Sequence, residues 1–226
     1  MENNTSVDKR AMSLEIIEKI YKAGVIAVLV IDKLKYAVPV AKALLKGGVN
    51  AIELTLRTPV AMDAAWAIKN EVPDMILGIG TVITVDQVKE IAKLGVDFAV
   101  SPGCNPKVIT AACEQNLSFA PGIVTPTDIE MAIEHGCRVM KYFPAESSGG
   151  IKNLISIATP YQYLGLSFIP LGGLNLANAA SYLESPIISA IGGSWIAKRS
   201  LIQTENWDAI TQNAIEIREL ITKFRK

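Results

Sequence analysis

The sequence is poor in residues that bind transition metals and in residues that form disulfides. Its 226 residues include one histidine, His135, and three cysteines. A single histidine excludes a His-rich metal site and leaves one residue that could assist a serine or cysteine nucleophile. His135 ends a helical pattern just before Gly136, which predicts a helix-capping role. Cys104, Cys113 and Cys137 are odd in number and include no C-x-x-C pair, which predicts reduced thiols.

The chain also lacks an excess of charge of either sign and lacks a long apolar run. Its 22 basic and 22 acidic residues cancel, and no run of Lys and Arg offers a footprint for a polyanion. The chain contains no stretch of about 18 apolar residues, the length needed to span a membrane. The opening "MENNTSVDKR" has no signal-peptide core. We therefore expect a cytoplasmic protein with neither nucleic acid nor membrane as partner, and a polar, flexible segment over residues 1–11.

What the sequence does have is a regular alternation of short β-branched runs with helical patterns. Half of its residues are hydrophobic, which suffices for a substantial core. The eight runs begin at Val25, Ala51, Met75, Asp97, Ser118, Arg138, Leu166 and Ile187. Helical spacing is clear over residues 58–71, 84–95, 125–136 and 205–224.

This order predicts a single (β/α)₈ TIM barrel, one domain over residues 1–226, because apolar strands separated by helices form a parallel sheet covered by helices. An extra N-terminal helix is expected over about residues 13–23, where it could close the barrel bottom. The alternative is an open, doubly wound sheet. It is less favoured because no G-x-G-x-x-G follows the first strand, where a dinucleotide-binding fold requires it.

Reacting groups in such barrels lie at the C-terminal ends of the strands, and the second strand ends in "IELTLRTP". Glu53 lies inside this apolar run, Thr55 shares its face, and Arg57 follows at the strand end. A buried carboxylate is costly unless it is paired or neutral. One interpretation is an ion pair between Glu53 and Arg57 that only closes the strand end. The functional one is a general acid/base beside a guanidinium that binds a carboxylate through two hydrogen bonds.

The sixth run, "RVMKYFPAE", places a lysine among apolar and aromatic residues. If Met140 and Tyr142 face the helices, Lys141 points into the barrel, where loss of water disfavours the ammonium and makes the nucleophilic amine available. A reactive lysine forms an imine with a carbonyl substrate, and the imine accepts electrons from a neighbouring carbon–carbon bond. The alternative is a lysine that covers apolar surface and reaches water with its charged end.

Other strand ends carry glycine, proline and hydroxyl groups. The third ends in "GIGTV", where Thr81 offers a hydroxyl, and the fourth in "AVSPGCNP", where Cys104 has no histidine to activate it. The seventh and eighth are followed by "PLGGLN" and "IGGSW". Two glycine loops after these two strands are where a barrel holds a phosphate, so they favour a phosphorylated substrate.

Together these motifs resemble the 2-keto-3-deoxy-6-phosphogluconate (KDPG) and 4-hydroxy-2-oxoglutarate (KHG) aldolases. The matching segments are "AIELTLRTP", "GIGTV", "FAVSPG", "PGIVTPTDI", "KYFPAE", "PLGGL" and "IGGSW", over roughly residues 17–198. The resemblance implies a class I lyase without metal or cofactor, usually a homotrimer. It would cleave KDPG to pyruvate and glyceraldehyde 3-phosphate in carbohydrate metabolism of the Entner–Doudoroff type.

The resemblance also implies a role for each motif residue. Lys141 would form the Schiff base, and Glu53 would be the acid/base that moves protons through a water. Arg57 and Thr81 would hold the pyruvate carboxylate, and Pro102 and Phe143 would form the apolar wall near its methyl group. The phosphate would be held by Gly172, Gly173 and Ser194.

One position departs from the family pattern and leaves the substrate open. Many gluconate-type members read Pro-Thr-Gly-Gly where this chain has Leu171 between Pro170 and Gly172. A lost hydrogen bond of about 0.5 to 1.5 kcal/mol shifts preference among substrates roughly threefold to tenfold. The galactonate-derived epimer, an unphosphorylated 2-keto-3-deoxy acid and KHG are alternatives. A sugar-phosphate isomerase or epimerase and a non-catalytic barrel that binds a metabolite are rival functions on the same fold.

Overall fold

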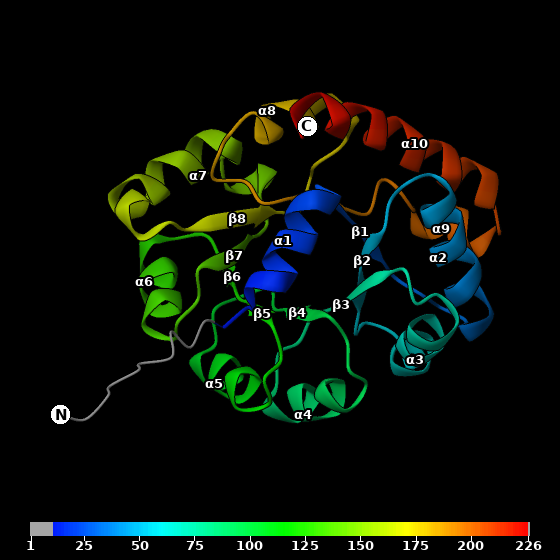
Figure 1. Ribbon diagram of the computed structural model, residues 1–226, viewed down its shortest axis with the longest axis horizontal. Helices are drawn as coiled ribbons and strands as arrows, with labels where there is room; N and C mark the ends of the chain where they lie inside the picture. Colours follow the sequence, from blue (N-terminus) through cyan, green and yellow to red (C-terminus); the bar gives the residue numbers. More distant parts are fainter. Residues whose placement is uncertain (1–10, 226) are drawn as a thin grey trace.

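The computed structural model describes residues 11–225, and strands alternate with helices over this range (Figure 1). The strands are β1 (Val25–Leu29), β2 (Ala51–Thr55), β3 (Ile76–Gly80), β4 (Phe98–Val100), β5 (Phe119–Ala120), β6 (Gly122–Ile123), β7 (Val139–Tyr142), β8 (Ser167–Pro170) and β9 (Ile191–Gly193). The helices are α1 (Leu14–Ala23), α2 (Ala37–Lys46), α3 (Ala61–Glu71), α4 (Val85–Lys93), α5 (Pro106–Glu114), α6 (Pro126–Glu134), α7 (Gly150–Ala158), α8 (Leu176–Leu183), α9 (Arg199–Gln203) and α10 (Trp207–Phe224). Three short 3₁₀ helices are η1 (Leu34–Tyr36), η2 (Glu146–Ser148) and η3 (Thr159–Leu164).

Every strand pairing is parallel, and paired strands follow one another along the chain except for β1 and β9, the first and the last strand. A six-stranded sheet has the order β5-β4-β3-β2-β1-β9, and a three-stranded sheet has the order β6-β7-β8. A doubly wound sheet reverses its strand order at a switch point, so that alternative was wrong. The result is an α/β fold in which a parallel sheet curves as in a TIM barrel, with helices outside it (Figure 1).

Two of the predicted strands differ from the structure in their extent. The run from Ser118 is split into β5 and β6 at Pro121, which has no amide N–H to give to a neighbouring strand. The last strand begins at Ile191 rather than Ile187. The segment before it forms an isolated bridge between Ile188 and Phe168, and Arg225 donates to the carbonyls of Ile188 and Ser189 at 2.6 and 3.1 Å. Those carbonyls are thereby occupied by a side chain.

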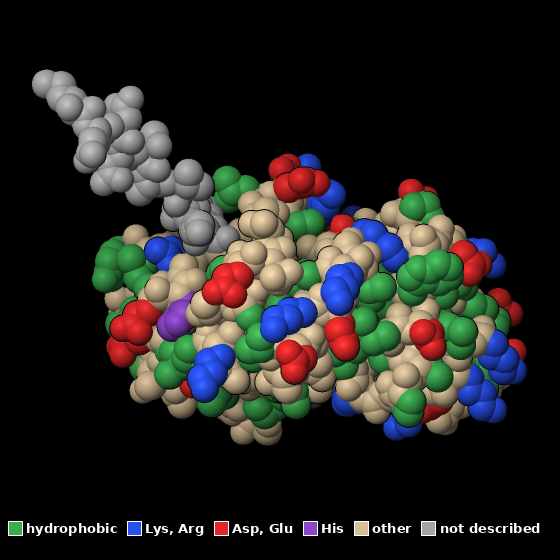
Figure 2. Space-filling view, turned by 90° about the horizontal axis from the view of Figure 1, so that it is seen from below, with side chains coloured by type: hydrophobic (Ala, Val, Ile, Leu, Met, Phe, Trp, Pro, Cys, Tyr) green, Lys and Arg blue, Asp and Glu red, His purple; other side chains and the backbone are tan. Residues whose placement is uncertain are grey.

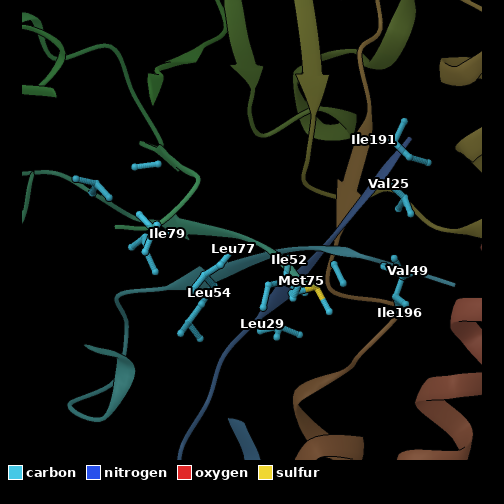
Figure 3. Packing of buried hydrophobic residues seen from close by; sticks show 14 of the residues in the cluster. Val25, Leu29, Val49, Ile52, Leu54, Met75, Leu77, Ile79, Ile191 and Ile196 are labelled. Carbon is cyan, nitrogen blue, oxygen red and sulfur yellow. The ribbon is translucent and has the colours of Figure 1, made fainter. Parts of the chain in front are cut away.

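Alternate residues of each strand face two different apolar layers. In β1, Val25 and Leu29 join the layer between strands and helices, and Figure 3 shows it with Ile52, Leu54 and residues of β3. The intervening Ile26 and Val28 belong to an inner cluster. This two-residue alternation, expected of a strand buried on both faces, decides which side chains can reach the interior.

Helix α1 covers one end of the inner cluster. Its N-cap Ser13 accepts a hydrogen bond from Ile16 N, and it ends at Gly24, whose φ of 70° suits a glycine cap. Ile16 and Ile20 pack into the inner cluster, and α1 lies across the middle of the strand arrangement in Figure 1. Ala11, at the edge of the predicted polar segment, is buried, and residues 1–10 of that segment lie outside the described residues.

Sequence signals for helix ends correspond to caps in the structure. Thr84 and Thr125 form capping boxes at α4 and α6. His135 is the C-cap of α6, with Nδ1 2.9 Å from the carbonyl oxygen of Met131, and Gly136 follows with a φ of 79°. The predicted capping role of His135 is thereby confirmed.

The surface carries charges of both signs. On the face shown in Figure 2, acidic and basic side chains are interspersed. Among the helices within residues 11–225, none has the length and apolar character needed to cross a membrane.

Candidate active site

A cavity of about 370 Å³ lies at the C-terminal ends of the strands. All nine residues predicted to act on or hold a substrate line it: Glu53, Arg57, Thr81, Pro102, Lys141, Phe143, Gly172, Gly173 and Ser194. The lining also includes Val28, Leu171, Leu174 and Gly193. A larger hollow of about 470 Å³ between Leu34 and Trp66 lies against η1 and α3, on the outside of the sheet, where barrels do not place reacting groups.

At the centre of this cavity is an ion pair between Lys141 and Glu53. The Nζ of Lys141 lies 2.9 and 3.1 Å from the two carboxylate oxygens of Glu53, and the two residues are 5% and 2% exposed. Lys141 also lies over the ring of Phe143, with Nζ 5.1 Å from the ring centroid. Met140 and Tyr142 pack in the outer layer, as the alternation predicts. The pair therefore joins two strands, β2 and β7, that are not neighbours in either sheet.

This geometry corrects two structural interpretations of the sequence. Glu53 does not pair with Arg57, because Glu53 points inward from β2 while Arg57 lies beyond the strand end and is exposed. Lys141 does not reach water as a surface lysine does, because it lies inside the barrel. Within residues 11–225, the guanidinium of Arg57 makes no hydrogen bond or ion pair. Arg57 can therefore offer its donors to a ligand carboxylate in the cavity.

The end of β3 is shaped around the carboxylate of Glu53. A Cβ added to Gly80 would lie 2.0 Å from Glu53 Oε1, so only glycine leaves room for the carboxylate there. The next residue, Thr81, has a φ of 65°. A β-branched residue in the left-handed region is strained by about 1–3 kcal/mol, and such strain is found mostly at functional sites. The backbone thus holds the Thr81 side chain on the cavity wall at a cost to stability.

The opposite part of the cavity is lined by backbone. Gly172 and Gly173 have φ angles of 95° and 84°, which side chains rarely allow. Helix α8 begins just after them, with Asn175 as its N-cap. Ser194, which follows the second glycine loop, is exposed on the same cavity. Glycine amides, a hydroxyl and a helix N-terminus together suit an anion such as phosphate.

The cysteines take no part in this arrangement. Cys104 does not line the cavity, and burial, with a smaller effect of the Asp128 carboxylate, raises the pKa of its thiol to about 11. Burial raises the pKa of Cys137 to about 12. At neutral pH both remain thiols, which are poor nucleophiles. Among residues 11–225, no group of three or more His, Cys, Asp and Glu side chains is arranged to hold a metal ion.

Sequence reasoning missed part of the apolar wall. Val28 lies beside Glu53 in the parallel register of β1 and β2, and counting in twos from Ile26 would have placed it on the inner face. Leu174 has no comparable signal, because it lies in a loop after the strand. Gly193 belongs to the "IGGSW" motif, which does not indicate which of its glycines faces the cavity. Its surface is covered on one side by the ring of Trp195, which a Cβ at that position would meet at 1.9 Å.

Comparison with known proteins agrees with this geometry. The family described as KDPG and KHG aldolase matches residues 16–213. The chain belongs to this family. The 2-dehydro-3-deoxy-phosphogluconate aldolase of Dickeya dadantii (strain 3937) is 42% identical over 200 residues, which cover 88% of this chain and 93% of the relative.

Solved structures of KDPG aldolases have the same fold. The enzyme from Legionella pneumophila, with pyruvate captured at low pH as a covalent carbinolamine intermediate, has a TM-score of 0.84 and 36% identity, covering 88% of this chain and 96% of the other. The enzyme from Zymomonas mobilis ZM4, with 3-phosphoglycerate, has a TM-score of 0.82 and 34% identity, covering 90% and 95%.

Proposed function

We propose that this protein is a class I aldolase that cleaves KDPG to pyruvate and glyceraldehyde 3-phosphate, and KHG to pyruvate and glyoxylate. The observation that carries the proposal is the buried amine of Lys141, held 2.9 Å from the Glu53 carboxylate inside a cavity. A lysine in such a setting can form an imine and has a proton acceptor beside it. The names of the relatives agree with the reaction, and the captured pyruvate of the Legionella pneumophila enzyme agrees with the chemistry.

In the proposed mechanism, the amine of Lys141 adds to the C2 ketone and the carbinolamine loses water to give the imine. Glu53 then takes the proton of the C4 hydroxyl, and the electrons of the C3–C4 bond move into the imine as the aldehyde leaves. The resulting enamine takes a proton at C3, and water hydrolyses the pyruvate imine. Glu53 serves as acid and base in turn. No metal or cofactor has a part in these steps.

The rest of the cavity would orient the substrate along its length. Arg57 and Thr81 bind the carboxylate next to the reacting ketone, with Pro102 and Phe143 against the C3 side. The three phosphate ligands would be Gly172, Gly173 and Ser194. This assignment is supported by the cavity, which all three residues line together with Lys141.

Leu171 is the feature that bears on substrate preference. Its side chain is 3% exposed and packs against Gly192, where an added Cβ would lie 2.7 Å from the leucine Cδ2. It lines the cavity with a methyl surface where a threonine would offer a hydroxyl. We infer that discrimination between the gluconate and galactonate substrates, and between phosphorylated and free acids, is altered at this position by up to about tenfold.

The assembly and cellular setting are proposed on the same basis. We infer that the chain forms one domain in which the two sheets close as a (β/α)₈ barrel with α1 across its end. Isolated bridges between Leu171 and Gly192 and between Phe168 and Ile188 support the closure. A cytoplasmic homotrimer acting in carbohydrate metabolism is expected from the family resemblance.

Reductive trapping tests the reaction class. Borohydride added to the protein with pyruvate should attach one reduced pyruvyl group to the peptide that contains Lys141, as read by mass spectrometry. Lys141→Arg is the matched variant, because arginine keeps the charge beside Glu53 but forms no imine. It should give no adduct and reduce cleavage to background. An unmodified wild-type Lys141, or full turnover by Lys141→Arg, would refute the imine mechanism and favour isomerase or epimerase chemistry on this barrel.

A further inference from the structure

The loop after β7 is bonded to the glycine loop after β8 through two main-chain hydrogen bonds. Ala145 N donates to the carbonyl of Leu171 at 2.7 Å, and Glu146 N donates to the carbonyl of Gly172 at 3.0 Å. In a trans peptide the N–H points away from the preceding carbonyl. Fixing the Gly172 carbonyl toward Glu146 therefore turns the Gly173 amide away from Glu146. The orientation of this anion-binding peptide thus depends on residue 146.

The side chain of Glu146 strengthens this contact. A Cβ added to Gly173 would lie 2.6 and 2.8 Å from the Cβ and Cγ of Glu146, so the stem of Glu146 packs directly on the glycine. Its carboxylate accepts a hydrogen bond from the hydroxyl of Tyr182. Tyr182 is 1% exposed and lies in α8, the helix that follows the glycine loop.

Neither residue lines the cavity, and the mechanism gives neither of them a role. Glu146 is nevertheless held from both sides, by Gly172 through its backbone and by Tyr182 through its carboxylate. Burial, together with the bond to Glu146, raises the pKa of Tyr182, so its hydroxyl stays protonated and remains the donor. This donor holds the carboxylate of Glu146 against α8.

We propose that Glu146 and Tyr182 form a positioning pair that fixes the Gly172–Gly173 peptide for binding the phosphate end of the substrate. The inference rests on the proposed function, because it assumes that this loop receives the phosphate. It assigns to both residues an effect on phosphate binding and none on imine formation, since the side chains of Lys141 and Glu53 hydrogen-bond to each other and to neither residue of the pair.

The test is steady-state kinetics with two substrates, KDPG with a phosphate and KHG without one. Tyr182→Phe keeps the ring packing and removes the hydroxyl, and we expect it to raise KM for KDPG about tenfold with kcat nearly unchanged. Its kcat/KM for KHG and its rate of pyruvate trapping should stay within about twofold of wild type. Glu146→Ala should behave in the same way, while Glu146→Gln, which keeps an acceptor for Tyr182, should recover most of the affinity.

A matched control is available in a second Tyr–Glu pair. The hydroxyl of Tyr161 donates to Glu130 at 2.8 Å on the surface, so Tyr161→Phe removes the same kind of bond away from the cavity. It should leave both substrates unaffected. Equal KM changes for KDPG and KHG in Tyr182→Phe, or no change for either, would overturn the positioning role.

A direct binding measurement separates this inference from the proposed function. Inorganic phosphate titrated calorimetrically should bind wild type more tightly than Tyr182→Phe by about tenfold. If wild type fails to trap pyruvate while this difference in phosphate affinity persists, the proposed reaction is wrong and the positioning role stands. If trapping succeeds and phosphate affinity is equal in the two proteins, only the positioning role is wrong.

Discussion

Gly80 leaves the space in which the carboxylate of Glu53 is placed. A methyl group at this position would overlap Glu53 Oε1 at 2.0 Å, while the φ of Gly80 lies outside the left-handed region, so alanine meets no backbone obstacle. Any effect of Gly80→Ala must therefore come from moving the carboxylate. A displacement of about 1 Å at a reacting group costs roughly 10²-fold in rate.

We expect Gly80→Ala to lower kcat/KM for KDPG about 10²-fold, with the protein still folded by circular dichroism. Gly103→Ala is the matched control, because a Cβ there meets nothing within 4 Å. It should retain wild-type activity. Wild-type kcat/KM in Gly80→Ala would show that the carboxylate can occupy another position without loss.

For individual residues, the sequence predicts some features of the site and leaves others open. Strand alternation predicts that Lys141 faces away from Met140 and Tyr142, and the structure shows that its side chain lies inside while these neighbours pack in the outer layer. It does not predict that Glu53 pairs with Lys141 rather than Arg57, because that contact joins strands far apart in the chain. The sequence also does not predict the left-handed backbone conformation of Thr81, because β-branched residues disfavour that conformation and only the surrounding structure imposes it.

Helix α1 shows how one element supports the fold from outside the strand arrangement. It has a polar and an apolar face, and the apolar face enters the inner cluster that lies below the cavity. Ile20 in this face is fully buried, whereas Leu14 at the start of the helix is 63% exposed. These two residues make the contribution of the helix measurable.

Ile20→Ala should reduce the free energy of unfolding by about 2–5 kcal/mol, because it removes buried methylene groups and leaves a cavity. Leu14→Ala, on the exposed side, should change it by less than about 0.5 kcal/mol. Urea denaturation followed by circular dichroism measures both. Similar losses in the two variants would mean that α1 is not anchored through its apolar face.

Element boundaries show which parts of the fold follow from local sequence. Caps such as Thr84 and Thr125 are predictable because Ser, Thr, Asp and Asn side chains bond locally to helix amides. The contacts just before β9 are not, because Arg225, which lies 37 and 36 residues further along the chain, donates to the carbonyls of Ile188 and Ser189. Long-range side-chain contacts of this kind leave no periodic signal.

For the molecule as a whole, the first and last strands are joined by pairing and also by an ion pair beyond their ends. β1 pairs with β9, and Asp32 after β1 receives hydrogen bonds from Arg199 Nε at 2.9 Å and from Gln203 at 2.8 Å. The Arg199 hydrogen bond, with help from Gln203, lowers the pKa of Asp32 to about 2. The first and last strands along the chain are thus linked beyond their ends by a carboxylate that stays ionised.

This pKa makes stability depend on pH in a defined range. The carboxyl has a pKa near 3.9 in an unfolded chain and about 2 in the folded protein. Its stabilising effect is therefore complete above about pH 4 and is lost as the pH falls toward 2. Asp32→Asn should lower the Tm at pH 6, and the difference from wild type should shrink between pH 4 and pH 2.

Thermal denaturation at a series of pH values tests this expectation. Glu18→Gln is a suitable comparison, because Glu18 pairs with Lys22 on the exposed face of α1 and joins no separate elements. It should change the Tm less than Asp32→Asn does. A difference between wild type and Asp32→Asn that stays constant down to pH 2 would exclude ionisation of Asp32 as its cause.

The ion pair between Lys141 and Glu53 also has a consequence for how this chain could change. Two opposite charges are kept out of water between β2 and β7, where well-packed apolar side chains of similar volume would often give equal or greater stability. Selection for thermal resistance alone would therefore tend to remove them. Keeping both charges lowers the folding stability and provides the reactive amine. The apolar interior around them, including Ile26 and Phe98, supplies the stability that offsets this loss.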